Sequence, residues 1–332
     1  GGEGPRVSVI SGWYNRTEDL EASVRSILDQ GDVDFEYIIV DDCSTDDTTQ
    51  QLAAMDHPRL RVIRNGVNIG FTRSMIRAVS EARGEYIAVH DAGDISLPGR
   101  LAAQVAFLDE NPGHVAVGTG CENHDLTTGA REVLRPAPMA TGNNIYSHGE
   151  VMFRRADYDA VGGYRPLFYY SQDSDLWRRL GERGRLGRID EVLYERRIFE
   201  DGVHSNRPVE VMQSIFSNLG AWAAFERRAT GTDPVSRRNA RALLELMGTR
   251  LLRARLTYPV KMLVKARQFR TAADALHRVP VGLMTGKLLA FYTVMRMVYS
   301  PPPYVQLLPV SVMEDPAPQG LPAAATVGGD SG

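Results

Sequence analysis

Short runs of apolar residues alternate with amphipathic stretches through the first 118 residues of the chain. The apolar runs predict buried strands over residues 7–10, 37–40, 60–63, 86–89 and 115–117. Between the runs, apolar side chains recur three and four positions apart, as Leu20, Val24, Ile27 and Leu28 do, which is typical of a helix with one buried face. This alternation predicts an α/β fold, with a mostly parallel sheet covered by helices on both faces.

The pattern changes beyond residue 120. We expect a strand over residues 148–154, a helix over 173–183 and a strand over 189–194. Nearly everything from residue 208 to 297 has a helical pattern, broken at residues 231–234, and the tail is rich in Pro, Ala and Gly. We therefore divide the chain into a first domain over residues 1–205, a helical C-terminal appendage over 206–300 and a disordered tail over 301–332.

Composition narrows the class of protein. The chain has 332 residues, of which 43% are hydrophobic, so it can bury a real core and is not disordered throughout. Two cysteines, Cys43 and Cys121, are too few for a disulfide framework or a cysteine-type zinc site. No uncharged apolar run reaches the roughly 18 residues that a membrane-spanning helix needs, so none is expected.

The charge is distributed unevenly along the chain. Residues 221–300 hold 15 Lys and Arg against 4 Asp and Glu, whereas residues 1–220 hold 23 against 34. Basic amphipathic helices can lie on an anionic membrane surface, although a helical bundle packed on the catalytic body would also fit. No nucleic-acid module pattern is present, so we expect no nucleic-acid partner. We expect a cytoplasmic protein, with peripheral contact at the inner face of the cell membrane through residues 221–300.

Polar clusters follow three of the predicted strands, over residues 11–16, 41–46 and 90–94. Because the carboxyl ends of parallel strands meet at one edge of a sheet, these clusters should surround one crevice. An aromatic ring there can stack on a nucleobase, and carboxylates on a turn can bind a divalent cation. Turn chemistry and helix capping would account for any one cluster alone, but less well for three that converge.

The ordered motifs resemble the family 2 glycosyltransferases of GT-A fold over about residues 5–205. The matching segments are residues 7–10, 14–15, 39–46, 68–74, 82–88, 91–101, 148–155, 162–165 and 171–177. The resemblance implies transfer of a sugar, with inversion, from a nucleotide-diphosphate donor, usually a UDP-sugar. It implies as acceptor a hydroxyl of a growing glycan or of a lipid-linked sugar.

The resemblance also assigns donor-site residues. In the matching motifs these are Gly12, Tyr14, Asn15, Asp42, Arg73 and Asp91. Asp42 would accept a hydrogen bond from the pyrimidine N3–H, and Gly12 and Tyr14 would form the base pocket. Arg73 would lie near the diphosphate, although the match at that position is loose.

An inverting displacement needs a general base for the acceptor hydroxyl. In the family this base is the Asp of a Glu-Asp or Gln-Asp pair at a helix start, and Gln172-Asp173 matches it. A helix N-terminus favours the ionised carboxylate that a base requires. The alternative is that Asp173 only caps the helix and that Asp175 lies in the first turn for the same electrostatic reason.

The metal motif departs from the family pattern. Its third position, normally the direct Asp ligand, is Gly93, so Asp91 and Asp94 remain to hold Mn²⁺ or Mg²⁺ directly or through water. The family often has a further His after Tyr-Arg-Ile, but here Phe199 stands in that place and the nearest candidate is His204. Metal-free transfer, with Arg73 or another cation opposing the leaving charge, and reduced activity are the alternatives.

Two further residues are candidates for the acceptor side. His148 precedes a matching motif but could equally be structural, and Trp177, one turn after Asp173, could stack on a sugar or pack in the core. Because of Gly93, a nucleotide-sugar-binding scaffold with weakened catalysis is the rival to an enzyme. A nucleotidyltransferase is disfavoured because residues 11–16 lack a glycine-rich, lysine-bearing phosphate loop.

Overall fold

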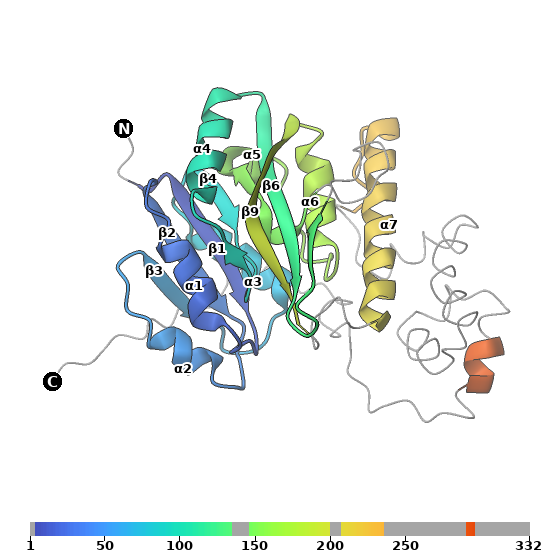
Figure 1. Cartoon of the computed structure of the whole chain (residues 1–332). Helices are drawn as coiled ribbons and strands as arrows, with labels where there is room; N and C mark the ends of the chain where they lie inside the picture. The colour runs from blue at the N-terminus through green and yellow to red at the C-terminus, as the bar shows by residue number, and fades with distance from the viewer. Residues whose placement is uncertain (1–3, 135–145, 200–206, 236–289, 296–332) are drawn as a thin grey trace. The chain divides into compact units, whose positions relative to one another are not determined.

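The computed structural model describes residues 4–134, 146–199, 207–235 and 290–295 (Figure 1). These residues fall into two compact units. One unit holds the residues up to Arg165 together with Leu176–Phe199, and the other holds Pro166–Asp175 and the described residues after Phe199. Every described strand belongs to the first unit.

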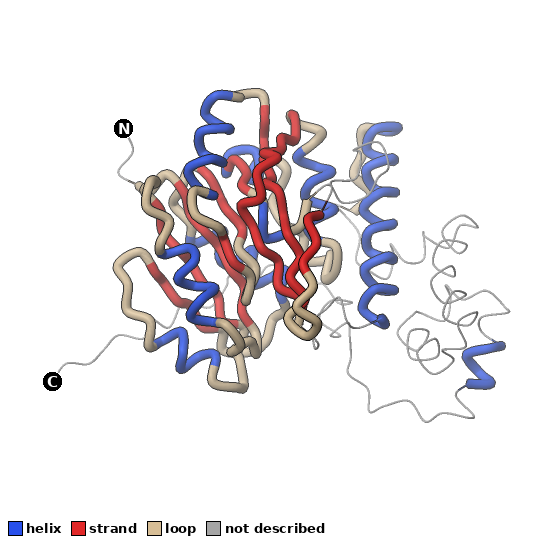
Figure 2. The backbone as a smooth tube through the Cα atoms, in the orientation of Figure 1, coloured by secondary structure: helices blue, strands red, loops and turns tan. Residues whose placement is uncertain are grey.

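The first unit is built on a nine-stranded sheet with the order β3-β2-β1-β4-β8-β6-β9-β5, and β7 pairs with β6 (Figure 2). The strands are β1 (Val7–Trp13), β2 (Phe35–Asp41), β3 (Leu60–Arg64), β4 (Tyr86–Val89), β5 (Ile95–Ser96), β6 (His114–Asp125), β7 (Arg131–Leu134), β8 (Met152–Arg154) and β9 (Arg185–Ile198). The run from β3 to β4 is parallel throughout, and β6 and β9 are also parallel.

Helices cover both faces of this sheet (Figure 1). In the first unit they are α1 (Leu20–Leu28), α2 (Thr48–Ala53), α3 (Phe71–Glu81), α4 (Arg100–Glu110), the short η2 (His148–Glu150) and α5 (Arg155–Ala160). Val9 and Ile39 pack in a cluster with Val24 of α1, whereas Ile10 packs in a second cluster with Met75 of α3. Because neighbouring strand residues point to opposite faces, burial of both faces explains the continuous apolar runs. The predicted α/β architecture is confirmed.

The second half of the sheet differs from the prediction because it is mixed. β8 is antiparallel to both β4 and β6, β7 to β6, and β5 to β9. The strand predicted over residues 148–154 is wrong in its first half, where η2 stands instead. There Gly149 lies so close to Tyr194 that a Cβ at Gly149 would lie 1.9 Å from the hydroxyl. The two-residue β5 was not predicted, because so short a segment carries no periodic signal.

The second unit contains helix α7 (Arg207–Thr230), and α6 (Gln172–Leu180) begins in this unit and continues into the first. α7 ends before Gly231, whose φ of 69° favours glycine, so the helix break predicted there is confirmed. The rest of the predicted appendage and the tail lie outside the described residues. No helix within the described ranges is long and apolar enough to cross a membrane.

Hydrogen bonds among Ser8, Glu36 and Gly84 connect the amino ends of β1, β2 and β4. The Ser8 hydroxyl donates to Glu36 Oε1 at 2.7 Å and accepts from the Gly84 N–H at 2.8 Å. A Cβ at Gly84 would lie 2.4 Å from the Ser8 nitrogen, which is backbone and cannot move aside. This close packing of the two backbones therefore requires glycine at position 84.

We expect Gly84→Ala to lower the free energy of unfolding by about 2 kcal/mol or more, because the added methyl forces β1 and β4 apart. Urea unfolding followed by circular dichroism measures this change. Gly66→Ala is the matched control, since a Cβ there meets nothing within 4 Å. Equal stability of the two variants would contradict the close packing at Gly84.

Candidate active site

The predicted convergence of the three polar clusters is confirmed, since β1 pairs in parallel with both β2 and β4. The first two loops are also tied together. The Asn15 N–H donates to Ser44 Oγ at 3.0 Å, the Thr45 N–H donates to Asn15 Oδ1 at 2.8 Å, and the Arg16 N–H donates to Thr48 Oγ1 at 2.9 Å. Asn15 has a φ of 48°, a left-handed conformation that asparagine tolerates better than most residues. Asn15 therefore fixes the shape of this edge.

Asp42 holds the segment that leads into α3. Its Oδ1 accepts from Asn65 Nδ2 at 2.7 Å and from the Ile69 N–H at 2.8 Å, and its Oδ2 accepts from the Gly70 N–H at 2.8 Å. The side chain lies almost wholly buried, with the residue 3% exposed. Each carboxylate oxygen can accept two bonds, so Oδ2 keeps capacity for one more donor beyond Gly70. Recognition of a base by Asp42 stays a prediction.

Tyr14 is one of the large apolar side chains that the described surface exposes, at 49%. Its neighbour Trp13 is buried and donates from Nε1 to Ser11 Oγ at 2.8 Å, so Trp13 belongs to the core. At Gly12, a Cβ would lie 3.2 Å from the ring of Phe71, so glycine lets α3 approach the end of β1. Arg73 follows in the first turn of α3.

Asp91 is linked to His148, which η2 presents. His148 Nδ1 lies 2.8 Å from Asp91 Oδ1, and His148 Nε2 lies 2.9 Å from the Tyr164 hydroxyl. A carboxylate only accepts, so Nδ1 carries the shared hydrogen. Burial by itself would raise the pKa of the Asp91 carboxyl, but His148 beside it lowers that pKa below its usual range. The structure thus brings together two predicted site residues that are far apart in the sequence.

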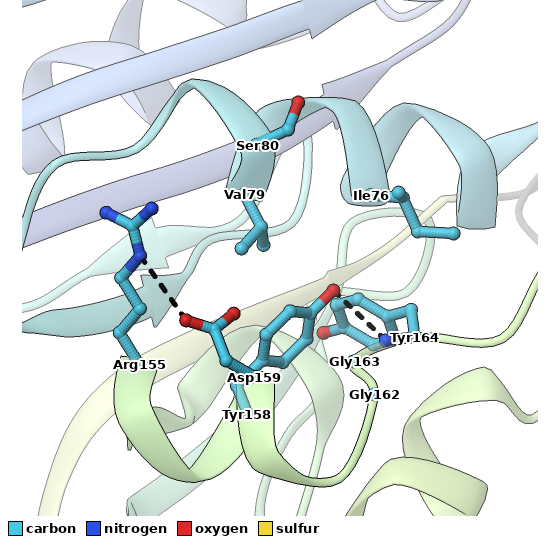
Figure 3. A pocket seen from close by; sticks show the side chains of 9 residues that line it. All are labelled: Ile76, Val79, Ser80, Arg155, Tyr158, Asp159, Gly162, Gly163 and Tyr164. Carbon is cyan, nitrogen blue, oxygen red and sulfur yellow. Dashed lines mark hydrogen bonds and ion pairs between the residues drawn. The ribbon is translucent and has the colours of Figure 1, made fainter. Parts of the chain in front are cut away.

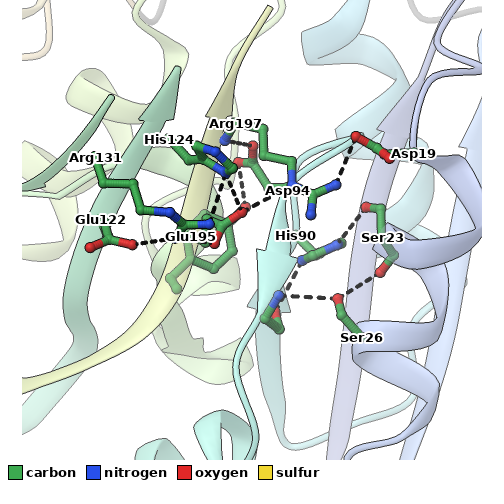
Figure 4. Close-up of polar contacts among 12 residues, drawn as sticks. Asp19, Ser23, Ser26, His90, Asp94, Glu122, His124, Arg131, Glu195 and Arg197 are labelled. Carbon is green, nitrogen blue, oxygen red and sulfur yellow. Dashed lines mark hydrogen bonds and ion pairs between the residues drawn. The ribbon is translucent and has the colours of Figure 1, made fainter. Parts of the chain in front are cut away.

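Asp94 is buried, and both of its oxygens accept hydrogen bonds. Oδ2 accepts from the Tyr194 hydroxyl at 2.7 Å and Oδ1 from the Arg197 N–H at 2.8 Å. Arg197 also forms an ion pair with Asp19 at 2.9 Å (Figure 4). Burial, followed by the nearby charge of Asp91, raises the pKa of Asp94 to about 8.

The loop over residues 91–94 offers few ligands for a divalent cation, since of its carboxylate oxygens only Asp91 Oδ2 has no protein donor within the described ranges. No group of three or more His, Cys, Asp or Glu side chains that could hold a metal occurs among the described residues. Asp94 has both oxygens engaged by protein donors, and Gly93 supplies no ligand. A Cβ at Gly93 would lie 2.9 Å from the ring of Phe199. His204, the other predicted ligand, lies outside the described residues.

The predicted base lies in the second unit. Asp173 stands in the first turn of α6, and its Oδ1 accepts from the Ser174 N–H at 2.7 Å. Asp175 is 1% exposed, and its N–H donates to the Ser171 carbonyl at 3.1 Å. Ser171 has a φ of 55°, and its hydroxyl donates to the Gln213 carbonyl of α7. These contacts define the start of α6, and the role of Asp173 stays a prediction.

Trp177 belongs to the first unit and is 2% exposed. Its ring lies 5.9 Å from that of Tyr146 and 6.0 Å from that of Phe153, measured between centroids. The side chain therefore packs in the core, where its burial gives no support to stacking on a sugar.

An open pocket of about 340 Å³ lies beside α3 (Figure 3). Ile76, Val79 and Ser80 of α3 line one side of it. The rest is lined by Arg155, Tyr158, Asp159, Gly162, Gly163 and Tyr164. The Tyr164 N–H donates to the Tyr158 hydroxyl at 3.0 Å. No predicted donor-site residue lines this pocket, so it is a separate feature.

Residues 8–199, more than half of the chain, match the family model described as "Glycosyl transferase family 2". The chain belongs to this family. EpsE of Bacillus subtilis (strain 168), which is named as a glycosyltransferase, is 40% identical over 203 residues, covering 58% of this chain and 73% of EpsE. The succinoglycan biosynthesis protein ExoO of Rhizobium meliloti (strain 1021) is 34% identical over 201 residues, covering 59% of this chain and 53% of ExoO.

Solved structures agree on the fold. The mannosyltransferase PcManGT of Pyrobaculum calidifontis, solved with GDP-Man and Mn²⁺, has a TM-score of 0.54 at 17% identity, over 88% of this chain and 86% of that one. TarS of S. aureus, solved with UDP, has a TM-score of 0.51 at 16% identity, over 88% of this chain and 87% of that one. This family 2 glycosyltransferase therefore has the GT-A fold.

Sequence reasoning missed Tyr194 as a site residue of this glycosyltransferase. The Tyr194 hydroxyl accepts from the Asp91 N–H at 3.1 Å and donates to Asp94 at 2.7 Å, so it bridges both ends of the loop. Tyr194 lies on β9, about 100 positions away from that loop. A tyrosine at a buried strand position is typical of a core residue, so the sequence did not indicate that its hydroxyl would form hydrogen bonds with the loop.

His90 lies buried beneath this loop, between Ser23 Oγ and Ser96 Oγ, each 3.1 Å from a ring nitrogen (Figure 4). Burial, and then the charge of Arg100, lower the pKa of His90 to about 3, so the folded protein holds the neutral ring. An unfolded histidine has a pKa of about 6.5. Between these values the unfolded chain binds more protons than the folded one, so stability falls as the pH drops from 6.5 toward 3.

We therefore expect His90→Gln to flatten the pH dependence of the unfolding free energy by up to about 1.4 kcal/mol per pH unit below pH 6. Urea unfolding of wild type and variant at pH 7 and at pH 5 gives the two slopes. His57→Gln, at a half-buried loop position between α2 and β3, serves as control. Identical slopes for His90→Gln and wild type would show that the ring is not held neutral.

Proposed function

We propose that this enzyme transfers a sugar, with inversion, from a UDP-sugar to a hydroxyl of a growing glycan or lipid-linked acceptor. The observation that carries the proposal is the shared carboxyl edge of β1, β2 and β4, which gathers Tyr14, Asp42 and Asp91 in one unit. Support for a role in polysaccharide biosynthesis comes from ExoO, named for succinoglycan, and from TuaG of Bacillus subtilis (strain 168), named for teichuronic acid.

For the donor, the exposed ring of Tyr14 stacks on the nucleobase. Asp42 accepts from the base N3–H through Oδ2, a match that favours uracil because its N3 carries a hydrogen. Gly12 and Asn15 shape the pocket, and Arg73 and Asp91 lie toward the diphosphate and the sugar. TarS, solved with UDP, supports the choice of nucleotide, whereas PcManGT, solved with GDP-Man, makes GDP the alternative.

For the chemistry, the acceptor hydroxyl attacks the anomeric carbon from the side opposite the diphosphate. A carbon–oxygen bond forms to the acceptor while the bond to the diphosphate breaks, and the nucleoside diphosphate departs with the electron pair. Asp173 takes the proton of the hydroxyl. Its place in the first turn of α6 favours the ionised carboxylate, because the helix N-terminus carries partial positive charge.

A lipid-linked acceptor would be presented at a membrane surface. The excess of Lys and Arg over residues 221–300 supports contact with anionic lipid headgroups. Most of these residues lie outside the described part of the chain, and their positive charge is what supports the contact.

We expect Asp173→Asn to lower the turnover number by about 10² to 10⁴-fold, because the amide cannot take a proton, while nucleotide affinity stays nearly unchanged. Turnover is measured as release of the nucleoside diphosphate, and affinity by calorimetry. Asp159→Asn, on an exposed side chain of α5, is the control. Equal loss of affinity and turnover would make Asp173 structural. Absence of turnover in the wild type, with donor binding retained, would favour the scaffold alternative.

We expect Tyr14→Ala to weaken nucleotide binding about tenfold, because the base loses its stacking partner. Tyr14→Phe should bind as the wild type does, since the aromatic face is kept. Calorimetric titration with UDP measures both, and the folded state is checked by circular dichroism. If Tyr14→Phe weakened binding as much as Tyr14→Ala does, the hydroxyl would instead be the contact.

A further inference from the structure

The two departures from the family's metal motif, Gly93 and Phe199, meet in the structure. A Cβ at Gly93 would lie 2.9 Å from Cζ and 3.0 Å from Cε2 of the Phe199 ring. Gly93 also has a φ of 89°, where a side chain is strained. The ring thus fills the space that a ligand side chain at position 93 would need.

A guanidinium lies on that ring. Arg16 Cζ is 4.1 Å from the centroid of Phe199, and Arg16 Cδ is 3.6 Å from the Cβ position at Gly93. This geometry is a cation–π contact, which fixes the orientation of the planar group. The backbone of Arg16 is anchored as well, through its N–H to Thr48 Oγ1.

Arg16 also contacts Glu18, with Nη1 2.9 Å from Oε2. The Glu18 side chain is 67% exposed, and such surface pairs contribute little to stability. A positive charge thus stands next to the loop position where a metal-binding carboxylate would bring negative charge.

The remaining carboxylates already have protein donors on three of their four oxygens. Both oxygens of Asp94 accept hydrogen bonds, and Asp91 Oδ1 is bonded to His148. A cation that used Asp94 would have to share an oxygen with the Tyr194 hydroxyl or the Arg197 N–H. The metal ions that accompany diphosphates usually need one or two protein carboxylates, and of the four oxygens of Asp91 and Asp94 only Asp91 Oδ2 has no protein donor in the described part of the chain.

We propose that the enzyme binds its donor diphosphate without a divalent cation, and that Arg16, held on Phe199, supplies positive charge there. The inference rests on the proposed function, since it assumes a nucleotide-diphosphate donor. A guanidinium donates two parallel hydrogen bonds to phosphate oxygens and keeps its charge at any physiological pH. When the bond between the sugar and the diphosphate breaks, Arg16 stabilises the negative charge that develops on the diphosphate.

The test is calorimetric titration of the full chain with UDP and with GDP, each in EDTA and in Mn²⁺. For whichever nucleotide binds, we expect the dissociation constants in EDTA and in Mn²⁺ to agree within about twofold. An affinity that Mn²⁺ raises about tenfold or more, and that EDTA removes, would overturn the inference but leave the proposed function intact. If neither nucleotide binds in either condition, the proposed function fails, and the inference fails with it.

Variants test the part of Arg16. Arg16→Gln should weaken nucleotide binding in EDTA about tenfold or more, because a charged hydrogen-bond donor is lost. Arg25→Gln removes the same charge from an exposed site on α1 and should change nothing. The double variant G93D/F199H removes the ring and adds two ligand side chains, so its nucleotide affinity should become sensitive to Mn²⁺. Circular dichroism confirms folding, and unchanged binding by Arg16→Gln would exclude the role of Arg16.

Discussion

The site depends on the parallel pairing of β1 with the strands on either side of it. Val7 pairs with Phe35 on β2 and with Tyr86 on β4, so the three strands begin in register. Strands that start together and run in the same direction deliver their following loops to one edge. Both faces of β1 are buried, so a slip of one residue would turn every side chain to the wrong face. Packing of the core therefore also fixes the positions of the site loops.

Beneath the loop over residues 91–94 lies a polar layer that gives it rigidity. Arg100 is fully buried, and it donates to the Val89 carbonyl at 2.7 Å and to Ser96 Oγ at 2.8 Å. His90 and Gln104 are buried beside it, each with hydrogen-bond partners. Buried polar groups are costly unless they are paired, and when they are paired they select one arrangement. The loop is consequently held from below by His90 and Arg100 and from the side by Tyr194.

The sequence allowed prediction of the elements that have strong local periodicity, and of the edge at which they end. The four parallel strands and the convergence of Tyr14, Asp42 and Asp91 followed from apolar runs and from the general behaviour of parallel sheets. The antiparallel half could not be predicted in the same way, because its strands do not alternate regularly with helices along the chain. The contacts of Gly93 with Phe199, and of Asp94 with Tyr194, belong to that half. Both departures from the metal motif were visible as single letters, but their contact was not.

The turn at Gly149 connects two sides of the site. Its backbone lies against the Tyr194 hydroxyl, which in turn contacts Asp91 and Asp94. The preceding residue, His148, bonds to Asp91 directly. Any side chain at position 149 would push the hydroxyl away and disturb both carboxylates. A change of sequence at this turn would therefore be transmitted to both carboxylates of the facing loop, so the turn and the loop cannot be altered independently.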